Sequence, residues 1–404
     1  MDGGRNRRFG LNTAAVHAGE APDPATGASA PAIAMSTTFV ADELGGFSAH
    51  DLTAESGYVY ARWGNPTVRM LQSKIAALEE TEACLCCASG MAAVAAVFFA
   101  RLSSGDHLIL SDVCYAGVAE LARTTLPRMG IAVSIVDLSD LTAVAAAIRP
   151  ETRLIHCETP ANPILRLTDL AALSRIAHKA GAEVSCDSTF ASPIVTKPAA
   201  LGVDYVIHSL TKYIGGHGDA LGGAVAGTAE KIAALSLEAG VHYGGVLSPF
   251  NAWLIARGAA TLPIRMKAHG QTAQAVAEWL EGQPAVTKVL YPGLASHPQH
   301  ALARRQMQGN SGMIAFQVFD KASGEALAAR MIEELEIIHY AVSLGHHRSL
   351  ITWIGTEAIL ESSFRLTGLQ EDGYRAWAGD GVFRLSIGLE DAVDLIADLQ
   401  SVLG

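Results

Sequence analysis

One lysine follows an apolar segment, with hydroxyl residues close before it in the chain. Residues 204–208 are rich in Val, Ile and Tyr, and Ser209, Thr211, Lys212 and a glycine-rich stretch come next. This pattern predicts a buried strand whose carboxyl end opens into a loop, and open α/β sheets bind ligands at that edge. A desolvated amine beside hydroxyls that can hold a phosphate suits covalent attachment of pyridoxal phosphate. Taken alone, the same residues also fit an ordinary surface lysine after a strand.

Three other predicted strands end in residues that would complete such a site. Gly90 and Met91 follow a strand and open a helix, so that backbone N–H groups would face a phosphate. Asp187 ends a second strand and would keep the pyridine nitrogen protonated, because a nearby negative charge favours the cationic form. Tyr115 follows a third strand with a ring suited to stacking and a hydroxyl suited to proton transfer. The alternative is an ordinary strand-to-helix turn at Gly90 and Met91, and a core aromatic residue at Tyr115.

Elements that would position these residues alternate between strand and helix patterns as far as about residue 230. The strands are expected at 83–88, 107–111, 132–136, 153–158, 183–187, 204–209 and 222–226. Such alternation predicts an α/β fold with a mainly parallel, seven-stranded sheet covered on both faces.

The two ends of the chain follow different patterns. Residues 1–60 are rich in Pro and Gly and predict an extended arm, before a cofactor-binding domain at 61–250. In residues 251–404, a long amphipathic pattern to about residue 280 precedes short strands expected at 286–291, 313–318 and 383–387, which predicts a smaller C-terminal α+β domain.

Composition narrows the class of partner. The 404 residues are 50% hydrophobic and 17% charged, with a formal net charge of −11. This balance favours a globular protein with a small-molecule partner over one that binds nucleic acid or an anionic membrane. We expect a cytoplasmic location, because no apolar membrane span or leader is evident. The six cysteines do not form two pairs with the spacing of a zinc site, so we expect reduced, buried thiols and no metal.

The ordered motifs together resemble the Cys/Met-metabolism family of pyridoxal phosphate enzymes, which contains cystathionine γ-lyase, cystathionine γ-synthase and methionine γ-lyase. The resemblance covers almost the whole chain and implies the aspartate aminotransferase-like fold of fold-type-I enzymes. The motifs that carry it lie at residues 16–19, 31–33, 60–67, 89–91, 158–163, 187–193, 204–218, 291–294, 343–345 and 384–386.

The resemblance also implies roles for single residues. Lys212 would hold the cofactor covalently and move protons, Asp187 would pair with the pyridine nitrogen, and Tyr115 would stack on the ring. The other residues that it assigns to the cofactor, for the phosphate and the ring oxygen, are Gly90, Met91, Asn162, Ser209 and Thr211.

Further assigned residues concern the neighbouring subunit and the substrate. Tyr60 and Arg62 would reach the cofactor phosphate of a neighbouring subunit, which implies a homodimer as the catalytic unit and a homotetramer as the expected assembly. Ser343 and Arg384 match contacts to the substrate carboxylate, for which a guanidinium fork is well suited.

Departures from the family pattern concern the substrate. Residues 116–117 lack the cysteine that methionine γ-lyases carry in this loop, and Ser188 stands where relatives commonly have Asn. Val342 resembles the small apolar residue of methionine γ-lyases and replaces the glutamate typical of cystathionine γ-lyases. Two further departures are the basic triplet 346–348 and the divergent segment 353–379, and both are candidates for shaping the substrate pocket. For the triplet, the alternative is a solvated turn.

The sequence therefore predicts a γ-elimination that releases ammonia and an α-keto acid from a γ-substituted L-amino acid. Substrates resembling methionine or homocysteine, or O-linked homoserine derivatives such as canavanine, fit this prediction. γ-Replacement on an activated homoserine ester, as in transsulfuration, is the alternative within the class. An inactive binding protein with the same fold is an alternative from another class, and a nicotinamide dehydrogenase lacks its glycine motif.

Overall fold

The computed structural model describes residues 9–41 and 57–404, so the parts of the predicted arm at 1–8 and 42–56 lie outside the described residues. Its larger sheet has seven strands in the order β1-β7-β6-β5-β4-β2-β3. These are β1 (Ala83–Cys87), β2 (His107–Ser111), β3 (Ala132–Val136), β4 (Thr152–Glu158), β5 (Glu183–Asp187), β6 (Tyr205–Ser209) and β7 (Gly223–Gly227). Only β7 runs antiparallel to its neighbours β1 and β6. The predicted α/β fold with a mainly parallel sheet is confirmed.

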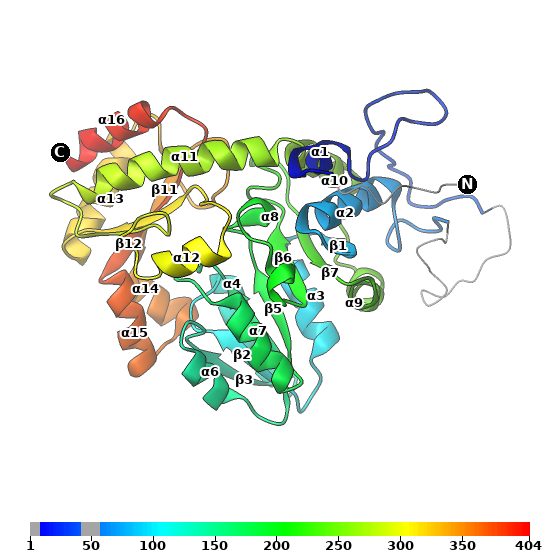
Figure 1. Ribbon diagram of the computed structural model, residues 1–404, viewed down its shortest axis with the longest axis horizontal. Helices are drawn as coiled ribbons and strands as arrows, with labels where there is room; N and C mark the ends of the chain where they lie inside the picture. Colours follow the sequence, from blue (N-terminus) through cyan, green and yellow to red (C-terminus); the bar gives the residue numbers. More distant parts are fainter. Residues whose placement is uncertain (1–8, 42–56) are drawn as a thin grey trace.

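The helices that follow these strands pack against them because their apolar residues are buried. Figure 1 shows this arrangement in blue to green. The α-helices of this part are α1 (Leu11–His17), α2 (Pro66–Glu79), α3 (Gly90–Arg101), α4 (Ala116–Glu120), α5 (Leu126–Arg128), α6 (Leu141–Ala147), α7 (Leu170–Lys179), α8 (Ser192–Val195) and α9 (Ala229–Leu235). Short π or 3₁₀ segments are η2 (Leu121–Thr125), η3 (Pro198–Leu201) and η4 (Ser236–His242).

A second sheet of five strands has the order β10-β11-β12-β9-β8. Its strands are β8 (Lys288–Leu290), β9 (Met313–Gln317), β10 (His339–Tyr340), β11 (Leu350–Gly355) and β12 (Gly381–Ser386). The accompanying helices are α10 (Pro249–Ala259), α11 (Leu262–Glu281), α12 (His300–Gln306), α13 (Lys321–Glu334), α14 (Thr356–Ile359), η5 (Leu360–Phe364), α15 (Leu369–Ala378) and α16 (Ala392–Leu403). The amphipathic pattern predicted as one unit to about residue 280 corresponds to two helices, α10 and α11. Pro263 lies in the first turn of α11, where an N–H group would have no acceptor within the helix, so that proline breaks no hydrogen bond there.

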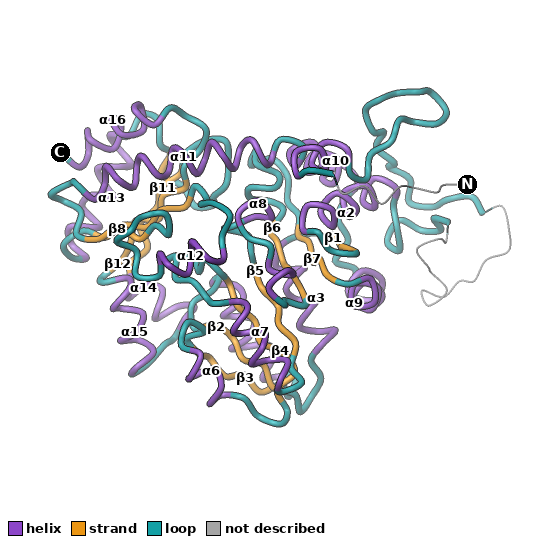
Figure 2. The backbone as a smooth tube through the Cα atoms, viewed as in Figure 1, coloured by secondary structure: helices purple, strands orange, loops and turns teal. Residues whose placement is uncertain are grey.

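The N-terminal segment is mostly loop and extends from the body of the molecule (Figure 2). It nevertheless contains α1, which the sequence analysis did not predict. Lys74 on α2 fixes this helix: its Nζ atom donates to the Ala15 carbonyl oxygen at 2.6 Å and pairs with Glu20 at 2.9 Å. Among the described residues, no helix is long and apolar enough to span a membrane.

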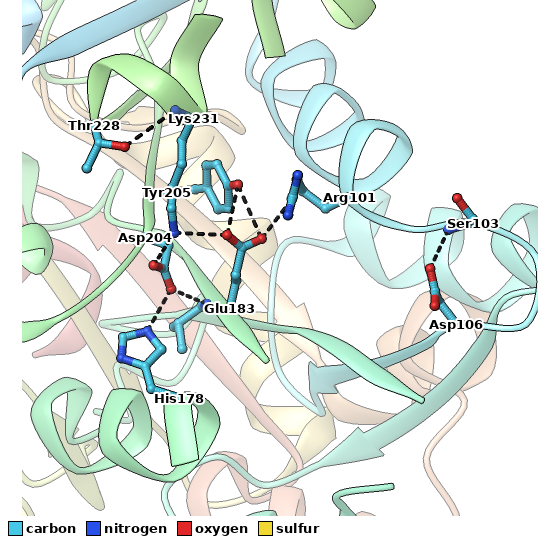
Figure 3. A network of polar contacts seen from close by, with 10 residues as sticks. Arg101, Ser103, Asp106, His178, Glu183, Asp204, Tyr205, Thr228 and Lys231 are labelled. Carbon is cyan, nitrogen blue, oxygen red and sulfur yellow. Dashed lines mark hydrogen bonds and ion pairs between the residues drawn. The ribbon is translucent and has the colours of Figure 1, made fainter. Parts of the chain in front are cut away.

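The amino ends of β5 and β6 carry a network of paired charges (Figure 3). Glu183 accepts from Arg101 at 2.7 Å and from the Tyr205 hydroxyl at 3.2 Å, and it pairs with Lys231 at 2.9 Å. Lys231 also contacts Asp204. This edge of the sheet therefore joins opposite charges, and the candidate site lies at the other edge.

Candidate active site

The carboxyl ends of the parallel strands open into a cavity of about 730 Å³. Loops of the larger sheet form one side of it, and residues around β10, β11 and β12 form the other. Eleven residues selected from the sequence line this cavity: Gly90, Met91, Tyr115, Asn162, Asp187, Ser209, Thr211, Lys212, Val342, Ser343 and Arg384.

Lys212 lies three residues after the end of β6, where the chain turns away from the sheet. Its Nζ atom donates to Ser343 Oγ at 2.7 Å. Burial, followed by the positive charge of Arg384, lowers the pKa of Lys212 from 10.5 to about 8. An amine with this pKa has a substantial neutral fraction close to physiological pH, and the neutral form is the nucleophile.

The N-terminus of α3 faces the same cavity as Ser209 and Thr211. Ser89 caps the helix by accepting from Ala92 N at 3.1 Å, whereas the first helical N–H groups, at Gly90 and Met91, have no acceptor within the helix. A Cβ atom at Gly90 would lie 3.0 Å from Ser209 Cβ, so glycine permits the close approach of helix and loop. The N-terminus of α3 and the Ser209 side chain thus lie side by side in the cavity wall, and Thr211 lines the same cavity.

Asp187 is the last residue of β5 and is held by Thr189, which donates to Asp187 Oδ1 from its backbone N at 3.0 Å and from its hydroxyl at 2.5 Å. The Thr189 hydroxyl oxygen also accepts from Ser209 N at 2.8 Å. Burial raises the pKa of Asp187, and the hydrogen bonds from Thr189 oppose that rise. This carboxylate therefore has a fixed position and gains from a cationic partner.

Glu158 is a buried carboxylate in the cavity wall to which the sequence analysis gave no role. Its two oxygens accept from Tyr115 N at 2.6 Å and from Asn162 N at 2.9 Å, so that it joins two loops of the site. Burial and the neighbouring Asp187 raise its pKa. A signal was present, because Glu158 ends β4 in register with Asp187 at the end of β5.

Arg384 reaches the cavity from β12 with 9% of its surface exposed. It donates from Nη1 to Asn162 Oδ1 at 3.0 Å and from Nη2 to the Ser343 carbonyl oxygen at 3.1 Å. Its buried Nε has no hydrogen-bond partner among the described residues. Burial lowers the pKa of the guanidinium group, so this site favours an anionic ligand that would restore a partner.

Two exposed residues and an apolar wall surround the rest of the cavity. Tyr115 is 50% exposed and Val342 is 77% exposed, although both line it. The divergent segment contributes a further part of the wall, with Trp353, Ile354, Gly355, Ala358, Ile359, Ser362, Ser363 and Phe364. The sequence analysis predicted neither β11 nor η5, and it identified this segment only by its divergence.

Tyr60 and Arg62 are not among the residues that line this cavity in the described part of the chain. Arg62 instead donates to the Val241 carbonyl oxygen and lies over the Tyr60 ring, 5.6 Å from its centroid. The basic triplet 346–348 is likewise absent from the lining, which favours the interpretation as a turn outside the pocket.

The residues of the cavity fit pyridoxal phosphate. The N-terminus of α3 offers unpaired N–H groups to a phosphate, and Asp187 offers a fixed carboxylate to a pyridine nitrogen. Lys212 offers an amine with a lowered pKa. Arg384 has an unpartnered Nε and can therefore bind a second anion in the same cavity as the amine. The carboxylate of an amino-acid substrate fits this position.

Comparisons with known proteins agree with this fit. A family described as Cys/Met metabolism PLP-dependent enzyme matches residues 12–404. Canavanine gamma-lyase from Pseudomonas canavaninivorans is 43% identical, over 97% of this chain and 95% of that protein. Cystathionine gamma-synthase from Mycobacterium bovis is 41% identical, over 98% and 97%. The crystal structure of metB from Corynebacterium glutamicum superposes with a TM-score of 0.87 at 37% identity, covering 98% of each chain.

Proposed function

The chain belongs to the Cys/Met metabolism family of PLP-dependent enzymes, and on this basis we propose that it eliminates the γ-substituent of an L-amino acid. The products are ammonia and an α-keto acid. One observation carries the proposal: a lysine amine with a pKa of about 8 lies in the same cavity as an arginine whose buried Nε lacks a partner. The two groups match the amine chemistry and the carboxylate of an amino-acid substrate.

When bound, pyridoxal phosphate supplies an aldehyde for amine exchange and a ring that accepts electrons from Cα. Lys212 would hold the cofactor covalently, would release it to the substrate amine, and would then move protons among the substrate carbons. Tyr115 would donate a proton to the leaving group, and Asp187 would keep the pyridine nitrogen protonated. Arg384 and Ser343 orient the substrate carboxylate. The shared cavity and the hydrogen bonds around Asp187 and Arg384 support these roles.

Cofactor phosphate binding is assigned to Gly90, Met91, Ser209 and Thr211, and Asn162 is assigned to the ring oxygen. The helix N-terminus, the close approach of Ser209 to Gly90 and the presence of Thr211 in the lining support the phosphate assignment. Asn162 is also held by Arg384, so that one amide links the cofactor end of the site to the substrate end.

The leaving group of the proposed substrate is small or uncharged, or is linked through oxygen as in canavanine. Val342 offers no charge at the mouth of the cavity, and the wall formed by Trp353, Ile359 and Phe364 is apolar. The relative named canavanine gamma-lyase supports an oxygen-linked substituent. The relative named cystathionine gamma-synthase supports the second candidate, γ-replacement on an activated homoserine ester.

The assembly that we propose is a homodimer with shared sites, in which Tyr60 and Arg62 contact the cofactor phosphate of the neighbouring subunit, and two dimers form a tetramer. The projecting loop segment and the 44% exposure of Tyr60 support this assignment. We also propose domain limits at residues 60 and 250 and a cytoplasmic location. All six cysteines are buried and free, as expected of a protein in a reducing compartment.

The test is a substrate panel followed by product identification. The purified protein, loaded with pyridoxal phosphate, is incubated with canavanine, methionine, cystathionine and O-succinylhomoserine, with and without a thiol, and products are identified by mass. Ammonia and an α-keto acid formed without thiol support elimination. Turnover that requires a thiol supports replacement, and an inert protein supports the binding alternative.

A further inference from the structure

A chain of polar contacts leads from Lys212 out of the cavity. Lys212 Nζ donates to Ser343 Oγ at 2.7 Å, and the same oxygen lies 3.3 Å from His346 Nε2. Because the ammonium group can only donate, the Ser343 oxygen accepts from it, and the Ser343 proton is free to point at the imidazole. His346 is half-buried and is not among the residues that line the cavity, so the chain of contacts ends at a residue that is partly exposed to solvent.

Two glycines permit the loop that carries His346 to pack closely against the segment that carries Lys212. A Cβ atom at Gly218, where φ is +71°, would lie 2.7 Å from His346 Cε1, and one at Gly345 would lie 2.6 Å from Tyr213 N. Gly345 N also donates to the Ser386 hydroxyl at 2.9 Å. The close approach of both glycines fixes the position of the imidazole relative to the strand end that carries the lysine.

Charges around the imidazole favour its neutral form. Burial lowers the pKa of His346, and the charges of Lys212 and His347 lower it further, whereas Asp219 raises it. His217, on the glycine loop, faces the ring of His347 at a centroid distance of 5.7 Å. A neutral imidazole with a free Nε2 lone pair is the form that accepts a proton.

We propose that His346 is a positioning residue that passes protons between Lys212 and solvent through the hydroxyl of Ser343. In the outward direction, Lys212 loses a proton to Ser343 Oγ while the Ser343 proton moves to His346 Nε2. The ammonium becomes an amine, the hydroxyl is regenerated, and the imidazole becomes an imidazolium that releases its proton to water. This role rests on the proposed function, because it presupposes that Lys212 is the reacting amine.

The experiment measures how fast cofactor-free protein captures pyridoxal phosphate, by stopped-flow absorbance between pH 6 and pH 9. His346→Gln keeps a hydrogen-bonding group but cannot take up a proton, and His346→Ala leaves space for added imidazole. His347→Gln is the matched control, since the neighbouring histidine does not contact Ser343 in the described contacts. Retained fold is checked by circular dichroism.

We expect His346→Gln to capture the cofactor at least about 10-fold more slowly at pH 7, since general acid–base catalysis commonly contributes more than that. His347→Gln should stay within about 2-fold of the wild-type rate. Imidazoles of increasing basicity should rescue His346→Ala to increasing extents. A purely structural imidazole would instead give rescue that does not depend on the basicity of the added base.

Two outcomes separate this relay from the proposed function. If the wild-type protein captures the cofactor at Lys212 and His346→Gln matches its rate at every pH, the relay is wrong and the proposed function stands. If the wild-type protein does not capture the cofactor at Lys212, the proposed function fails and the relay fails with it.

Discussion

The two ends of strands β5 and β6 place the same types of residue in opposite electrostatic surroundings. At the amino end, burial alone would lower the pKa of Lys231, but hydrogen bonds to Asp204 and other partners raise it. At the carboxyl end, the Nζ atom of Lys212 has the neutral hydroxyl of Ser343 as its only hydrogen-bond partner among the described residues, and the pKa of Lys212 falls to about 8. Lys231 is therefore stabilised as a cation, whereas Lys212 loses its proton more readily and can then react as a nucleophile.

The aspartates of the two ends differ in the same way. Burial alone would raise the pKa of Asp204, but hydrogen bonds from Lys231 and His178 lower it. In the described part of the chain, Asp187 has no such cation among its hydrogen-bond partners, and burial raises its pKa. At the amino end, Lys231 and Asp204 stabilise each other's charged form. At the carboxyl end, Lys212 and Asp187 have shifted pKa values and are available to a ligand, as is common at active sites.

Removing the two lysines in turn gives the largest expected contrast. Lys212→Ala should lower turnover by several orders of magnitude, because no other amine lines the cavity in the described part of the chain. Lys231→Ala should keep turnover within a few-fold and cost about 1 kcal/mol or less of stability, since the pair is partly exposed. Steady-state rates and thermal melts measure both. Near-normal turnover by Lys212→Ala would refute the assignment.

Neutralising the two aspartates tests the second half of the comparison. Asp187→Asn should lower turnover by about 100-fold or more, because loss of one electrostatic stabiliser commonly costs that much, with a modest loss of stability. Asp204→Asn is the control and should change turnover only slightly. Equal turnover in wild type and Asp187→Asn would show that this carboxylate is not the partner of the ring nitrogen.

Mixing two impaired variants tests whether the carboxyl-end site is shared between subunits. Arg62→Ala should weaken cofactor retention, because the guanidinium is assigned to the phosphate of the neighbouring site. Hybrids of Arg62→Ala and Lys212→Ala chains should recover part of the activity, since one site then combines both intact halves. Activity is measured after hybrid formation is verified by native mass spectrometry. No recovery in such hybrids would place the site within one chain.

A smaller effect is expected on substrate preference, which we attribute to residues at the mouth of the cavity. Cystathionine should be poor relative to substrates with a small or uncharged distal end, because its distal ammonium would lose a partner at a cost of about 1–3 kcal/mol. Val342→Glu should improve its relative kcat/KM. Arg348→Ala should leave the substrate ranking unchanged, because Arg348 is exposed and outside the described lining. Finding cystathionine to be the best wild-type substrate would overturn this interpretation.

The sequence was sufficient for the larger sheet because its strands are short apolar runs between clear turn signals. The observed β2, β3 and β5 have the predicted limits, and the remaining strands of that sheet shift by one residue at their ends. Lys212 and Asp187 could be placed at one edge, since parallel strands bring their carboxyl ends together. Their separate pKa directions depend on burial and could not be predicted from the chain alone.

The second sheet and the wall of the cavity were harder to predict. β11 contains Trp353 and Ile354, and it pairs with β12, which begins only after the intervening residues 356–380, so no local pattern marks it. The π segment 360–364 has no distinct sequence period. The contact between His346 and Ser343 depends on the positive φ of +87° at Ser343 and on the nearby glycines. Such contacts arise from tertiary geometry rather than from local pattern.

The most direct measurement is the pH dependence of covalent cofactor attachment, mapped by mass after reduction with borohydride. Cofactor-free protein is mixed with pyridoxal phosphate, reduced and digested. Because the neutral amine reacts and burial lowers its pKa, we predict a single modified peptide that contains Lys212, with an attachment rate that rises through a midpoint of about 8. Modification at other lysines, or a midpoint near the ordinary 10.5, would contradict it.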